Sequence, residues 1–141
     1  MKKRFGNFVL LVLALSFLLS VSALAADTRA SAQISDYYMD AYAYGGGQIA
    51  IEFSVACNGR MSRLGALEIA IYEKSGTSWL QKHTYTEYSE GMAISNSAEY
   101  SNTIYYDGTV GRTYKVEVTV FARNSEGEDM RFREFTSIVV R

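Results

Sequence analysis

Apolar and polar residues alternate along most of the chain beyond residue 32, and this pattern constrains the fold more than any other feature of the sequence. The clearest stretch is 48–57, where every second residue is apolar: Ile49, Ile51, Phe53, Val55 and Cys57. Side chains of a β-strand point alternately to opposite faces, so the pattern is typical of a strand with one buried face. We therefore expect the chain to fold as β-structure.

Two further stretches alternate clearly. In 64–74 the residues expected to point inward are Leu67, Ile69 and Ile71. In 113–123, Phe121 is expected to point outward, and the inward residues are Tyr114, Val116, Val118, Val120 and Ala122. Weaker alternation predicts strands at 34–44, 78–88, 97–106 and 130–140. Glycine-containing turns such as Asn58-Gly59 separate them, so the sequence predicts an all-β, antiparallel two-sheet sandwich of about seven strands over residues 32–141.

The strand expected at 113–123 begins with a local pattern that resembles a tyrosine corner. A turn from Asp107 to Gly111 leads into Tyr114, which is followed by valines at alternate positions. The pattern resembles strand F of immunoglobulin-like and fibronectin type III sandwiches, where a tyrosine hydroxyl bonds to nearby backbone. This chain lacks the proline usual in the fibronectin pattern, and Trp79 lies later than the tryptophan of their strand B. The resemblance implies a structural role for Tyr114.

The first 25 residues have the three parts of a secretory signal peptide. Three basic residues follow the initial Met, residues 8–19 form an apolar run, and small residues end the segment. Cleavage is expected between Ala25 and Ala26, which leaves 26–31 as a flexible lead. The alternative is an uncleaved membrane anchor, but a span needs about 20 apolar residues. We expect a secreted, extracellular protein with no membrane span after cleavage.

A second resemblance is carried by short segments beyond the expected signal peptide. These are 29–31, 61–66 with the following strand 69–73, Ser78-Trp79, and the residues from Gly111 to Tyr114. Together they are similar to a family of small, uncharacterised secreted proteins of Gram-positive bacteria. That family has a domain of unknown function, so the resemblance implies secretion and a sandwich fold, and it implies no activity.

The charge balance argues against nucleic acid as a partner. Without the three basic residues at the start, 11 of the 14 basic residues remain against 15 acidic residues, a formal net charge of −4. Binding to nucleic acid or to an anionic membrane surface requires clustered positive charge, and no basic run follows residue 25. We therefore expect neither partner.

The chain has one histidine, His83, and one cysteine, Cys57, which leaves few routes to catalysis or metal binding. Zinc needs three or four ligands, the Gly-x-Ser-x-Gly turn is absent, and a dyad of these two residues is disfavoured because both fall in strands. Cys57 is in phase with buried residues; the alternative is an exposed thiol that pairs between chains. The turn 124–129 carries oxygens for calcium without a known spacing, and a polar hairpin turn is preferred. We expect no cofactor, no metal and no enzymatic activity.

Tyrosine is the one residue type that stands out, with four of the 11 tyrosines between 36 and 44. Alternation places Tyr38, Asp40, Tyr42 and Tyr44 on one face of this strand, and the residues of the other face suit a core: Tyr37, Met39, Ala41 and Ala43. Outward tyrosines suit sugar rings or a protein partner, whereas cross-strand pairing or reversed faces would give them a structural role.

These observations favour a secreted, non-enzymatic binding module for cell-wall glycan (polysaccharide) or a surface protein. A self-associating structural envelope protein is the alternative, and a small hydrolase built on two carboxylates is a third, less favoured hypothesis.

Overall fold

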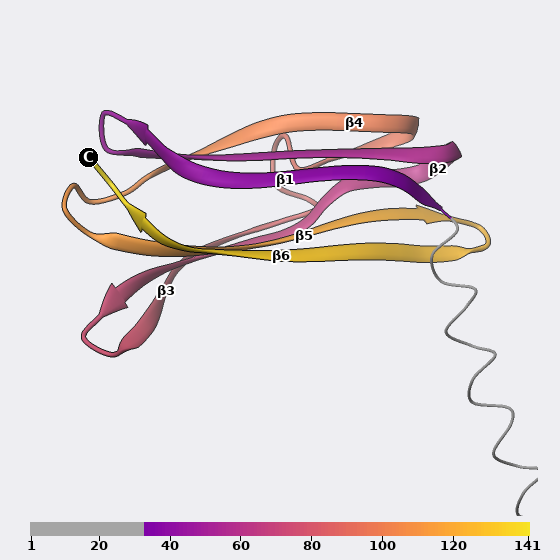
Figure 1. Ribbon diagram of the computed structural model, residues 1–141. Coiled ribbons are helices and arrows are strands. Elements are labelled where there is room, and N and C mark those ends of the chain that lie inside the picture. Colours follow the sequence, from indigo (N-terminus) through magenta and orange to yellow (C-terminus); the bar gives the residue numbers. More distant parts are fainter. Residues whose placement is uncertain (1–32) are drawn as a thin grey trace, which may run out of the picture. The chain divides into compact units, whose positions relative to one another are not determined.

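Six antiparallel strands pair into one curled sheet in the computed structural model, which describes residues 33–141 (Figure 1). The strands are β1 (Ile34–Gly45), β2 (Gln48–Ser75), β3 (Ser78–Thr86), β4 (Ala93–Asp107), β5 (Thr113–Asn124) and β6 (Gly127–Val139). The all-β, antiparallel prediction is confirmed. The expected signal peptide (1–25), its cleavage point at Ala25 and Ala26, and the lead 26–31 lie outside the described residues. None of the helices sought within 33–141 is long and apolar enough to span a membrane.

The long strand β2 belongs to both halves of the sheet. Its first part, from Gln48 to Ala56, lies between β1 and β4, whereas its later part, from Glu68 to Glu73, lies between β3 and β5. Strand β6 then pairs with the free side of β5. Figure 1 shows β1 and β4 in one layer and β5 and β6 in the layer facing it. The apolar core therefore fills the space between two halves of a single sheet.

The sequence prediction of a turn at Asn58-Gly59 is wrong, and the strands expected at 48–57 and 64–74 are one strand. The pairing of β2 with β4 loses register between Ala56 and Met61, so that β2 bends there and continues. The bend is tied down by Arg60, whose guanidinium donates to the Asn96 carbonyl oxygen at 2.8 Å. The described residues consequently contain six strands instead of about seven.

The expected inward residues of 48–57 and 113–123 line the core, with two corrections elsewhere. Leu67 is only partly buried because β2 shifts register against β5 between Ala66 and Glu68. Phe121, expected to point outward to solvent, is fully buried. It lies opposite Gly65 on β2, and the Arg123 guanidinium lies 5.0 Å from its ring centroid.

The remaining strands differ from expectation at their ends. Strand β4 begins at Ala93, four residues before the predicted start of 97–106, and β3 ends at Thr86. Strand β6 begins at Gly127, so the expected turn 124–129 is a tighter hairpin in which Asn124 already pairs with Gly127.

Tyr114 is buried at the start of β5 and its hydroxyl has two hydrogen bonds. It accepts from the Thr109 backbone N–H at 2.8 Å and donates to the Glu73 carboxylate at 2.8 Å. Gly108 packs so closely here that a Cβ would lie 2.9 Å from Val140 and 3.2 Å from the Tyr114 ring. These contacts fix the connection between β4 and β5 against the end of the chain.

Candidate functional site

The outer surface of β1, β4 and the first part of β2 gathers tyrosines and carboxylates from all three strands. The strand register places Tyr42, Ala50 and Tyr105 in one row across the sheet. The adjacent rows are built in the same way, and alternate residues of each strand share this surface. We call this surface the tyrosine–carboxylate face, defined by Tyr38, Tyr42, Tyr44, Tyr105, Asp36, Asp40, Glu52, Glu99 and Asp107.

Strand β1 orients this face because its opposite side packs into the core. Met39 and Ala41 are buried, whereas the four tyrosines of the face are between 38% and 58% exposed. Tyr37, expected on the core side, is also exposed, and the Arg131 guanidinium lies 5.9 Å from its ring centroid at the sheet edge. That the exposed tyrosines bind a ligand stays a prediction.

Tyr105 is the tyrosine of this face that the sequence pattern missed. Its ring meets that of Tyr44 edge-on, with the centroids 5.2 Å apart. The two residues lie on β4 and β1, more than 60 positions apart in sequence, and only the register of both strands against β2 brings them together. No local signal in the sequence indicates that register.

Two tyrosine hydroxyls donate to carboxylates within the face. The Tyr42 hydroxyl lies 2.6 Å from a Glu52 oxygen, and the Tyr38 hydroxyl lies 3.3 Å from an Asp40 oxygen. The hydrogen bond to Glu52, with partial desolvation, raises the pKa of Tyr42 to about 12. Desolvation and the nearby Asp40 carboxylate also raise the pKa of Tyr38. Both rings therefore stay protonated and tethered to a carboxylate at neutral pH.

The five carboxylates of the face form none of the ion pairs found within residues 33–141. Asp36 and Asp40 accept from the backbone N–H of the next residue, at 2.9 and 2.8 Å. Asp40 lies directly across from Glu52 on the neighbouring strand. Like charges in that position destabilise a sheet, so folding alone gives no reason for the pair.

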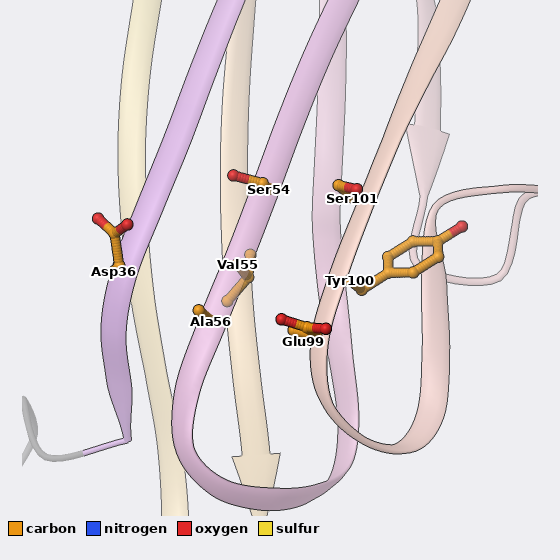
Figure 2. A pocket seen from close by; sticks show the side chains of 7 residues that line it. All are labelled: Asp36, Ser54, Val55, Ala56, Glu99, Tyr100 and Ser101. Atoms are coloured by element: carbon orange, nitrogen blue, oxygen red, sulfur yellow. The ribbon is translucent and has the colours of Figure 1, made fainter.

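A shallow groove of about 480 Å³ crosses one end of the face. Its floor is made by the small residues Ser54, Ala56 and Ser101, and Figure 2 shows Asp36 on one side of it and Glu99 on the other. The Tyr100 ring turns away from this floor (Figure 2) and its hydroxyl donates to the Gly91 carbonyl oxygen at 3.0 Å. The groove therefore offers carboxylate oxygens beside a flat polar surface.

The other residues considered from sequence lie away from this face. Cys57 is partly buried, and this burial raises the pKa of its thiol. His83 is exposed on β3, with its ring centroid 4.4 Å from that of Tyr85. No hydrogen bond or ring contact found among residues 33–141 joins Cys57 to His83.

The oxygens of the 124–129 hairpin are occupied by donors of the protein itself. The Asn124 side-chain oxygen accepts from Gln33 at 2.9 Å and from the Glu126 backbone N–H at 2.8 Å. Glu128 pairs with Arg123, and the buried Asp129 pairs with Arg131. Within the described part of the chain, no three metal-ligating side chains come together as a cation site.

Comparison with known proteins leaves the argument to this geometry. No protein-family model, no curated protein and no solved structure matches the chain.

Proposed function

We propose that the protein is a secreted, non-enzymatic binding module that holds a cell-wall glycan on the tyrosine–carboxylate face. The observation that carries this proposal is the presence of four exposed tyrosine rings beside carboxylates on one sheet face. Aromatic rings offer rigid apolar area with a polar tip, which suits the C–H faces of sugar rings. Carboxylates that lack a cation are available to accept hydrogen bonds from sugar hydroxyls.

We also propose that the curled sheet is an immunoglobulin-like or fibronectin type III-like sandwich. Its support is the pairing order, with β1, β2 and β4 in one half and β3, β2, β5 and β6 in the other. The bond from the Thr109 N–H to the Tyr114 hydroxyl supports it as well, because a tyrosine corner makes this kind of contact. Export is supported by the signal-like residues 1–25 and by the resemblance to secreted Gram-positive proteins.

A glycan fits this face better than the alternative partners do. A protein interface typically has an apolar centre with few charges, whereas this surface has carboxylates throughout and a floor of Ser and Ala. A self-associating envelope protein would have to bring the same uncompensated charges of two copies together, which repulsion opposes. A surface-protein partner and self-association are therefore outcomes that the test must separate.

The test is retention of the purified protein on insoluble cell-wall material and on a panel of polysaccharides. We expect retention that is lost in a triple variant of the face, Tyr38→Ser, Tyr42→Ser and Tyr44→Ser. The matched control changes three exposed apolar residues elsewhere: Leu80→Ser, Tyr88→Ser and Phe132→Ser. Equal loss in both variants, or no retention on any matrix, would contradict the proposal. A dimer in light scattering would then favour self-association, and release of reducing sugar would favour a hydrolase.

A further inference from the structure

We infer that the bound glycan carries protonated amino groups, and that Asp40 and Glu52 hold one of them between neighbouring strands. This inference rests on the proposed function and narrows it to one class of ligand. It starts from the charge of the tyrosine–carboxylate face, which has five carboxylates and no lysine or arginine among its defining residues. Such a surface attracts cationic ligands and repels anionic polymers.

The opposite half of the sheet shows how an ammonium group completes such an arrangement. There Glu117 lies directly across from Glu134, as Asp40 lies across from Glu52. The Lys115 ammonium binds both carboxylates, at 2.6 Å from Glu117 and 3.4 Å from Glu134. One positive charge thus relieves the repulsion between two carboxylates that face each other across strands.

A tyrosine ring accompanies the cation in both places. The Lys115 nitrogen lies 4.4 Å from the centroid of the Tyr72 ring, where the face of the ring attracts positive charge. On the tyrosine–carboxylate face, Tyr42 is bonded to Glu52 and Tyr38 to Asp40, so rings are held beside this carboxylate pair as well. The pair has two carboxylates and nearby rings, and it lacks only the ammonium group.

The groove beside the pair extends the same chemistry along the sheet. Asp36 and Glu99 border it one strand row beyond Tyr38, and neither forms an ion pair within the described residues. A polymer with amino groups on successive sugars would therefore meet a second pair of carboxylates. A neutral N-acetylated sugar would contact the same rings without gaining from either pair.

The test compares soluble oligomers of glucosamine, of N-acetylglucosamine and of galacturonic acid by calorimetry at about pH 5.5, where carboxylates are ionised and amines protonated. We expect the glucosamine oligomer to bind about tenfold more tightly than the acetylated one, a preference that a few exposed ion pairs supply. The preference should shrink as salt is added, because exposed charges are screened. The galacturonic acid oligomer should not bind.

The double variant Asp40→Asn and Glu52→Gln should lose the preference while it still binds the acetylated oligomer. The control, Glu68→Gln with Glu126→Gln, removes the same charge from exposed positions off the face and should keep it. Equal binding of both oligomers by the unchanged protein would overturn this inference and leave the proposed function standing. Binding of none of the three oligomers, or of an oligolysine peptide alone, would overturn both.

Discussion

The two outer surfaces of the curled sheet treat facing carboxylates in opposite ways. On the outer side of β5 and β6, Lys115 binds both Glu117 and Glu134. On the tyrosine–carboxylate face, Asp40 and Glu52 oppose each other with only tyrosine hydroxyls as side-chain donors. A fold that supplies a cation to one pair and withholds it from the other leaves unsatisfied charge on one side only.

The same contrast extends to the wider surroundings of the two surfaces. On the β5 side, the buried Glu87 carboxylate lies between Arg63, at 2.8 Å, and Arg123, at 3.3 Å. Phe121 is fully buried on that side beneath Arg123. The β5 side is therefore built for stability, whereas the tyrosine–carboxylate face gives up stability to keep rings and charges available.

The largest expected difference between the two surfaces concerns aromatic side chains. Phe121→Ala should lower the free energy of unfolding by about 3–5 kcal/mol, because a fully buried ring leaves a cavity. Tyr42→Ser should lower it by less than about 1 kcal/mol, since the ring is exposed. Urea denaturation of both variants measures the difference. Equal losses would break the comparison, because Tyr42 would then have a structural role.

Glu87 should give the next largest effect and a dependence on pH. Its burial disfavours the ionised carboxylate, but hydrogen bonds and charges from Arg123 and Arg63 outweigh this, and the pKa of Glu87 lies below its ordinary value of 4.5. The ion pairs therefore stabilise the fold above about pH 4.5, and this stabilisation is lost as the pH falls toward the lower folded-state pKa. Glu87→Gln should cost about 2 kcal/mol at pH 7 and remove this part of the acid sensitivity.

Thermal unfolding between pH 3 and pH 7 checks this expectation. An acid response of Glu87→Gln identical to that of the unchanged protein would show that other carboxylates cause it.

The two facing carboxylate pairs should respond to substitution with opposite signs. Lys115→Met leaves Glu117 and Glu134 facing each other without a cation and should cost about 1 kcal/mol. Asp40→Asn keeps the acceptor for the Ala41 N–H and removes a repulsion, so it should raise the free energy of unfolding by up to about 0.5 kcal/mol. Chemical denaturation at low salt compares them. A loss of stability in Asp40→Asn would mean that the Asp40 charge supports the fold.

Much of this fold was predictable because alternation is a local property of the chain. The strand faces of 48–57 and 113–123 follow from which residues are apolar, and so does the inward position of Met39. The continuity of β2 was not predictable, because the chain bends at Asn58-Gly59 only through its pairing with β4. Burial of Phe121 was equally hidden, since it depends on the neighbouring strand presenting Gly65.

The candidate site was predictable only in its β1 part. Tyr38, Asp40, Tyr42 and Tyr44 follow from the alternation of one strand. Glu52, Glu99 and Tyr105 join them through the register of three strands, which no short segment of sequence specifies.

The smallest expected effect is on a titration. The Glu52 carboxylate holds the pKa of Tyr42 at about 12, so Glu52→Gln should bring it down toward the ordinary value of 10. The absorbance of ionised tyrosine, followed from pH 8 upward, should then show one more group titrating near pH 10 than in the unchanged protein. Identical titration curves would show that the hydrogen bond from Tyr42 to Glu52 does not persist in solution.

The most direct test of the whole account is an amide-resolved NMR titration of the purified protein with a soluble glucosamine oligomer. We expect shifted amides to cluster on β1, on the Gln48–Ala56 part of β2, and on β4, around the tyrosine–carboxylate face. The amides of β5 and β6 should stay in place. Shifts concentrated on β5 and β6, or none at saturating oligomer, would contradict the claim that the protein keeps this face for a ligand.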